Sequence, residues 1–76
     1  MTKLTIKLTS IKDVQDFVNA VGKFQGDVDL QSGRYVVDAK SIMGIFSLDL
    51  LNPIEMTIHS DGADELIASL ERFIVK

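Results

Sequence analysis

The 76-residue chain contains no cysteine, no tryptophan and only one proline. Without cysteine there is no disulfide, no thiolate nucleophile and no thiolate metal site. Long apolar runs are also absent, since none approaches the ~20 residues that a membrane-spanning helix needs. The N-terminus alternates polar and apolar residues and lacks the apolar stretch of a signal peptide. The cytoplasm is therefore the simplest location that the sequence predicts.

Charge is also limited, with 8 basic and 11 acidic residues and a net charge of −3. The basic residues form no cluster, which argues against nucleic acid and against a membrane surface as the main partner. Asp27, Asp29, Asp38 and Asp49 lack the spacing of a calcium loop. The chain offers no catalytic triad, no glycine-rich phosphate loop and no pair of catalytic carboxylates. We therefore expect no metal, no cofactor and no enzymatic activity.

What the sequence does contain is clear hydrophobic periodicity over a length that indicates one domain, residues 1–76. Alternating apolar residues predict strands, and spacings of three and four predict helices. The predicted order is β-α-β-β-α-β-α, with strands near 4–8, 27–31, 34–39 and 54–58. Because every strand has one apolar and one polar face, we expect an α/β (α+β) open-faced sandwich. It would consist of a four-stranded antiparallel sheet with three helices on one face.

Two serines mark predicted helix starts. Ser10 precedes a helix from about Ile11 to Val21, and Asp13 follows three residues later, as in a capping box. Ser41 precedes a short helix that ends before Pro53 and is expected to cap it through its hydroxyl oxygen.

A hairpin is predicted between the second and third strands. Ser32-Gly33 is a two-residue turn signal. The register that follows places Leu30 opposite Tyr35 and Val28 opposite Val37, with Tyr35 on the core side of the sheet.

The short helix has two apolar faces. Ile42 and Ile45 can supply the face that packs on the core. Met43, Phe46 and Leu50 then form either a further layer of core or an exposed surface. A flexible methionine beside an aromatic side chain is typical of contact surfaces, so we expect these three residues to dock a partner.

Two stretches resemble a known family. Residues 40–48, Lys-Ser-Ile-Met-Gly-Ile-Phe-Ser-Leu, and residues 60–65, Ser-Asp-Gly-Ala-Asp-Glu, are similar to the corresponding segments of the HPr family, the phosphocarriers of the bacterial sugar phosphotransferase system. The resemblance implies an open-faced sandwich and partners among the phosphotransferase proteins and their regulators. It also implies that Ser41 corresponds to the regulatory serine that HPr kinase/phosphorylase modifies in related proteins.

The resemblance fails at the family's phosphoacceptor motif, G-x-H-A-R-P. In this alignment Ser10 takes the place of the histidine, Lys12 that of the arginine and Asp13 that of the proline. His59, the single histidine, does not match the family's active-site position. Ser10 and Lys12 thus mark a degenerate phosphocarrier position.

These observations predict a regulatory or protein-interaction domain that does not carry phosphate on histidine. Two alternatives stay open at this stage. One is a phosphocarrier with a different acceptor, for which Ser10 is the first candidate. The other is a structural interaction domain unrelated to phosphorylation.

Overall fold

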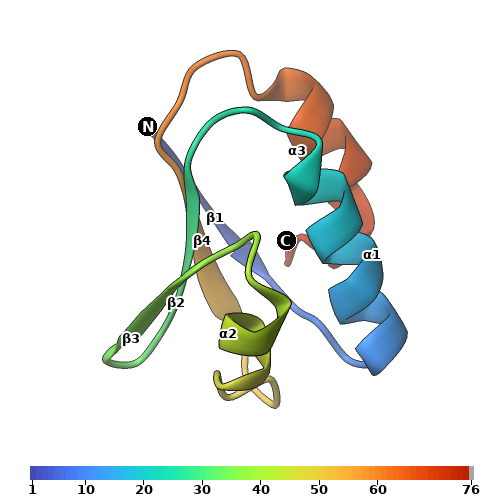
Figure 1. The fold of residues 1–76 in the computed structure, drawn as a ribbon, viewed down its shortest axis with the longest axis vertical. Coiled ribbons are helices and arrows are strands. Elements are labelled where there is room, and N and C mark those ends of the chain that lie inside the picture. The colour runs from blue at the N-terminus through green and yellow to red at the C-terminus, as the bar shows by residue number, and fades with distance from the viewer. Residues whose placement is uncertain (76) are drawn as a thin grey trace.

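The elements follow the predicted order in a computed structural model that describes residues 1–75. They are β1 (Thr2–Ile6), α1 (Ile11–Gly22), β2 (Val28–Ser32), β3 (Tyr35–Asp38), α2 (Ile42–Phe46), β4 (Ile54–Ile58), α3 (Asp64–Ser69) and the 3₁₀ turn η1 (Glu71–Phe73). The four strands form one antiparallel sheet in the order β1-β4-β2-β3. All three α-helices lie on the same side of that sheet (Figure 1). The predicted open-faced α+β sandwich is therefore confirmed.

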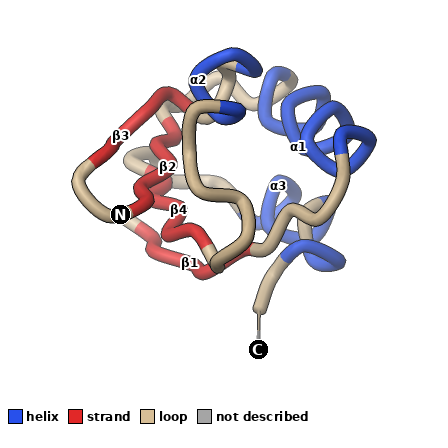
Figure 2. Tube along the Cα trace, turned by 90° about the horizontal axis from the view of Figure 1, so that it is seen from below, coloured by secondary structure: helices blue, strands red, loops and turns tan. Residues whose placement is uncertain are grey.

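The core lies between the sheet and the helices, and its centre combines one face of each central strand with the apolar stripe of α1. Phe17 of α1 is fully buried and packs edge-on against Phe73, with ring centroids 6.0 Å apart. Leu30 and Met56, paired across β2 and β4, are equally buried. No polar or charged side chain among residues 1–75 is buried. The opposite face of the sheet is uncovered (Figure 2).

The strands β2, β3 and β4 and the helix α1 lie within one residue of their predicted ranges, whereas β1 lies two residues earlier. β1 ends at Ile6, although Leu8 beyond it is still buried as the alternation predicts. The last helix, α3, ends at Ser69 and is followed by the 3₁₀ turn, so the buried Leu66 and Phe73 belong to two short elements. No helix within the described residues is long and apolar enough to cross a membrane.

The predicted hairpin register was wrong by two residues. Ser32 pairs with Tyr35, and Leu30 pairs with Val37, so the two-residue turn consists of Gly33 and Arg34. Gly33 has φ of 60°, as in a type II′ turn, which places glycine at the first central position and not at the second. Tyr35 lies on the same face of the sheet as Leu30, as predicted, but at the end of the hairpin, where it is 70% exposed and not part of the core.

Replacing Gly33 with valine should destabilise the protein by about 1 kcal/mol or more. The space around the missing Cβ is open, so the cost arises from forcing a β-branched residue to a positive φ. Urea unfolding of the wild type and the variant measures it. A matched Gly22→Ala change, at a helical position that also has open space, should not be destabilising.

Candidate functional site

The first part of the candidate site is the N-terminus of α1. Ser10 adopts an extended backbone conformation and its Oγ accepts a hydrogen bond from the backbone N–H of Asp13 at 3.0 Å. The predicted N-cap is therefore confirmed. Ser10 is exposed, but its hydroxyl oxygen already serves the first turn of the helix.

The carboxylate of Asp13 lies at the same helix end. Its Oδ2 accepts hydrogen bonds from the backbone N–H of Thr9 at 3.0 Å and from the Thr9 hydroxyl at 2.8 Å. Arg72, which follows α3, approaches the other oxygen at 3.6 Å and binds Asp16 at 2.7 Å. The start of α1 thus already holds a fixed negative charge, at the helix end where the dipole favours an anion.

These contacts shift the titration of Asp13. The backbone N–H of Thr9, followed by the Thr9 hydroxyl, holds the pKa of this carboxyl below its ordinary value of 3.8, and Arg72 acts in the same direction. Because the folded pKa is depressed, the stabilising effect is present above the unfolded value and disappears as the pH falls through the folded value.

Asp13→Asn should therefore lower the free energy of unfolding near neutral pH, where the wild type carries the carboxylate. The difference between the two proteins should shrink towards acid pH, because the wild-type carboxyl is then also neutral. Urea unfolding at several pH values from about 7 down to about 2.5 checks this. A difference that stays constant over the whole range would contradict the assigned role of the charge.

Lys12 does not turn towards Ser10. Its side chain is 80% exposed and its Nζ pairs with Asp16, one helical turn further along α1, at 3.3 Å. Ser10 and Lys12 are therefore only two positions apart in the sequence, but the lysine pairs with Asp16 further along the helix. Lys12 therefore does not direct its positive charge towards Ser10, as a cation that assists an acceptor residue would.

The second part of the site is Ser41 at the start of α2. Its Oγ accepts from the backbone N–H of Gly44 at 3.2 Å, and its carbonyl accepts from Ile45 at 3.0 Å, so the predicted cap is confirmed. A Cβ at position 44 would lie 3.2 Å from both the Ser41 oxygen and the Val37 Cβ, so glycine gives these neighbours room that a larger residue would reduce. Ser41 itself is exposed to solvent.

Exposed or partly exposed apolar side chains belong to α2, which Ser41 caps, and to the segment that follows it. Met43 is 78% exposed and Phe46 is 41% exposed, whereas Leu50 is partly buried. The predicted exposure of this surface is thus confirmed, and Ile45 and Leu48 provide the buried face of the same segment. We call this surface, together with two residues that the sequence analysis did not include, the docking patch: Ile11, Met43, Phe46, Leu50 and Leu51.

The two additional residues connect the start of α1 to the end of α2 and the segment that follows it. Ile11 is 67% exposed and Leu51 is 87% exposed. Both line a hollow of about 290 Å³ with Ser10, Phe46 and Leu50, among others. Ile11 continues the apolar stripe of α1 backwards by three residues from Val14, which was the available sequence signal.

A lysine holds the loop that carries Leu50 and Leu51. Lys7, just after β1, donates a hydrogen bond from Nζ to the carbonyl oxygen of Leu51. This contact links the β1–α1 connection to the segment after α2, although the two residues are 44 positions apart. It positions both leucines beside the start of α1.

His59 lies far from this site. It follows Ile58, which pairs with Thr2 at the start of β1, whereas Ser10 follows the other end of β1. The imidazole contacts the Asp29 carboxylate at 2.8 Å, and both side chains are 41% exposed. The only histidine and the start of α1 are therefore at opposite ends of the sheet.

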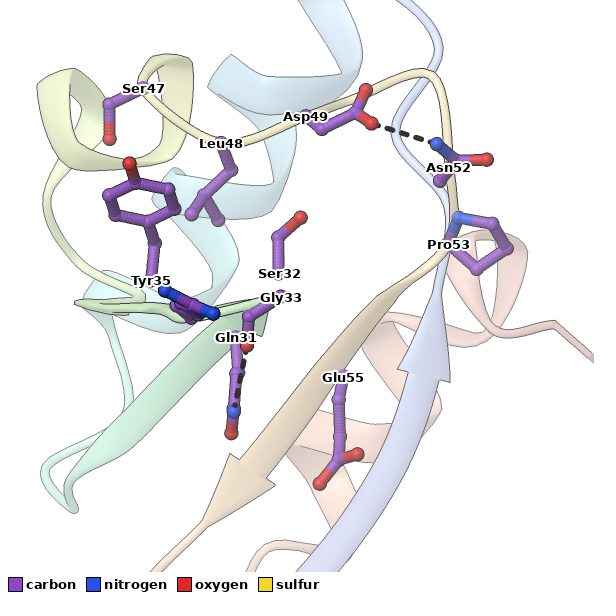
Figure 3. Close-up of a pocket in the computed structure, with 11 residues that line it drawn as sticks. Gln31, Ser32, Gly33, Tyr35, Ser47, Leu48, Asp49, Asn52, Pro53 and Glu55 are labelled. Carbon is purple, nitrogen blue, oxygen red and sulfur yellow. Dashed lines mark hydrogen bonds between the residues drawn. The ribbon is translucent and has the colours of Figure 1, made fainter.

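A wider groove of about 770 Å³ opens between the β2–β3 turn and the segment from α2 to β4 (Figure 3). Asn52 donates to Asp49 at 2.8 Å along its rim, and Gln31 donates to the Gly33 carbonyl at 3.2 Å. Its lining contains none of the predicted site residues. Within residues 1–75, no group of three or more histidine, aspartate or glutamate side chains is placed to hold a metal ion.

Comparison with known proteins supports the family resemblance, and the matching region begins just after the position where that resemblance fails. The family model described as "PTS HPr component phosphorylation site" matches residues 11–76, beginning one residue after Ser10. The crystal structure of HPr-C-His from Thermoanaerobacter tengcongensis is similar, with a TM-score of 0.80 and 28% identity over 95% of this chain and 89% of that chain.

Two further solved structures share the fold. The phosphocarrier protein HPr from Bacillus anthracis str. Ames has a TM-score of 0.75 and 23% identity, over 97% of this chain and 96% of that chain. The histidine-containing phosphocarrier protein of a Mycoplasma has a TM-score of 0.76 and 15% identity, over 93% and 89%. At these identities the likeness supports the fold alone.

Proposed function

The chain belongs to the HPr family of the phosphotransferase system, and we propose that it is a regulatory, protein-recognition member that does not carry phosphate on histidine. The observation that carries the proposal is the docking patch, an exposed apolar surface that includes Met43 and Phe46 of the short helix that the exposed Ser41 caps. Its partners would be proteins of the phosphotransferase system or their regulators. The protein itself would act as a recognised substrate and ligand, and not as an enzyme.

Ser41 is the proposed regulatory phosphorylation site. A phosphate there would add about −1.5 to −2 charges beside apolar side chains that a partner must cover. The helix start tolerates the charge, because its backbone N–H groups and its dipole favour an anion. Partners that present arginine would gain charge-assisted hydrogen bonds, while partners with an apolar or acidic surface would lose affinity.

A phosphocarrier role for Ser10 is the less favoured alternative. Its oxygen is occupied as the cap of α1, and the Asp13 carboxylate occupies the same helix end. A phosphoryl group on Ser10 would be repelled by that carboxylate, and Lys12 is engaged by Asp16. A serine phosphate ester is also a poor donor for onward transfer compared with a phosphohistidine.

The test is incubation of the protein with ATP and HPr kinase/phosphorylase, followed by intact-mass and fragment analysis. The proposal expects one phosphate, located on Ser41, and no label in the Ser41→Ala variant. Absence of any modification would remove Ser41 from the proposal and would favour a structural interaction domain unrelated to phosphorylation.

A further inference from the structure

The two edges of the sheet are not equivalent. At the β1 edge, the chain after η1 adds backbone hydrogen bonds: Val75 N–H donates to the Thr5 carbonyl, and Lys7 N–H donates to the Phe73 carbonyl, both at 2.8 Å. An isolated bridge between Ile6 and Ile74 completes this cover. β3 forms the other edge, and Figure 2 places it at the outer side of the sheet, away from α1. Within residues 1–75 no strand covers it.

The outer side of β3 carries free backbone groups. The N–H of Ala39 donates to the Val28 carbonyl at 2.9 Å, which identifies that pair as hydrogen-bonded. Bonded and non-bonded pairs alternate along an antiparallel ladder. Val37 therefore also bonds to β2, whereas Val36 and Asp38 direct their N–H and C=O groups away from it. Val36 is in addition 57% exposed.

We propose that a second copy of this chain pairs with β3, antiparallel and across a two-fold axis, with Val36 opposite Val36 of the second copy. The two valines would exchange both backbone hydrogen bonds, and Tyr35 would lie opposite Val37. Such a contact is isologous, so it closes as a dimer that joins two sheets into one.

Charge complementarity identifies the occupant and the register. With Val36 opposite Val36, Arg34 of each copy lies opposite Asp38 of the other. Arg34 has no ion-pair or hydrogen-bond partner among the described residues, and Asp38 uses only Oδ1, as the acceptor for the Lys40 backbone N–H at 2.9 Å. Because Arg34 lies in the turn just before β3, the dimer would thus bring two pairs of opposite charges together at the ends of the new strand pair.

The other registers that use the same outward groups are unfavourable. Placing Val36 opposite Asp38 brings Arg34 opposite Lys40, which is a pair of like charges. Placing Asp38 opposite Asp38 of the second copy brings two carboxylates together. Like charges directly opposite each other destabilise a strand pair, so the charges of β3 and of the turns on either side of it favour one pairing.

The contact is small, because β3 has only 4 residues. A stable protein interface usually buries about 1,600 Å², and a four-residue edge buries much less. The expected dimer is therefore weak and depends on protein concentration. It does not involve the docking patch, so it stands or falls independently of the proposed function.

The experiment is sedimentation equilibrium of the full chain from about 10 µM to about 1 mM, a range suited to weak association. The wild type should show a monomer–dimer equilibrium. Arg34→Asp alone and Asp38→Arg alone should each lower the association constant at least about tenfold, because each variant places like charges opposite each other twice. An equimolar mixture of the two variants should recover association, because the mixed dimer again pairs opposite charges at both positions.

A second variant keeps the proposal testable if Asp38→Arg does not fold. Val36→Pro removes only an N–H that points away from β2, a position where an edge strand accepts proline. It should abolish the dimer while leaving the thermal transition of the monomer in place. The proposal is overturned by a wild type that stays monomeric, by a variant mixture that associates no better than its components, or by loss of the dimer in Phe46→Ser, which would place the contact on the docking patch.

Discussion

Replacing Phe46 with serine should lower the efficiency with which HPr kinase/phosphorylase modifies Ser41 by about 30-fold, the effect of losing one aromatic hot spot. Phe46 is the aromatic member of the docking patch and lies within two helical turns of Ser41. With 41% of its surface exposed, Phe46 can contribute contact area to a partner, and it lines the hollow together with Ile11. The measurement is kcat/KM for phosphorylation, with the thermal transition recorded for each variant.

Val75→Ser provides the matched control. Val75 is 44% exposed, close to the value for Phe46, but it lies on the C-terminal segment beside β1. We expect its substitution to leave kcat/KM within about twofold of the wild type, as for a residue outside the interface. Equal losses for the two variants would mean that the effect is a general one on stability, and the docking patch would not be a recognition surface.

The second large effect concerns Ser41. Ser41→Ala should abolish the phosphate incorporated from ATP and should cost about 1 kcal/mol of stability through loss of the cap on Gly44. Ser41→Asp should keep the cap, because aspartate also accepts from backbone N–H groups at a helix start and suits the dipole. The aspartate variant should therefore fold like the wild type and change its choice of partner.

Binding assays against proteins of the phosphotransferase system separate these roles. If a partner responds to phosphorylation, the wild type and Ser41→Asp should differ in affinity, and Ser41→Ala should behave like the unphosphorylated wild type. Identical affinities for wild type, phosphorylated wild type and Ser41→Asp would leave Ser41 with a structural role only.

Local patterns in the sequence predicted most of the fold. Period-two alternation and helical spacing follow from which face of each element is buried, so they identified the strands and helices and the side of the sheet that is covered. Ser10 and Ser41 were predicted as caps for a similar reason, because each bond joins residues only 3 apart in the chain. Such contacts depend on little beyond the local backbone.

The hairpin register was not predictable in the same way. Pairings that differ by two residues keep every side chain on the same face, so the hydrophobic pattern cannot distinguish them. The position of Gly33 within the turn decides between them, and a type II′ turn places it first. A turn at Ser32-Gly33 would place the glycine second and would pair Tyr35 with Leu30, whereas Tyr35 pairs with Ser32.

The remaining features of the site depend on contacts between distant parts of the chain. Arg72 reaches Asp13 across 59 positions, and Lys7 reaches Leu51 across 44. Leu51 belongs to no periodic pattern, because it lies in a loop, and its place in the docking patch becomes visible only in three dimensions. The sequence alone indicated that Asp13 adds a negative charge at the α1 start, but not that Thr9 and Arg72 hold its carboxylate in place.

The most direct test of the central claim is the mass of the protein after incubation with phosphoenolpyruvate and the first enzyme of the phosphotransferase system. A histidine-containing HPr in the same reaction serves as the positive control. We expect no added mass for the wild type, because the helix start holds Ser10 as a cap and the Asp13 carboxylate beside it. Ser10→His should gain little, because Lys12 and Asp13 stay in place. An increase of about 80 Da in the wild type, equal to one phosphate, would contradict the account, whether it is acid-labile, as on histidine, or acid-stable, as on serine.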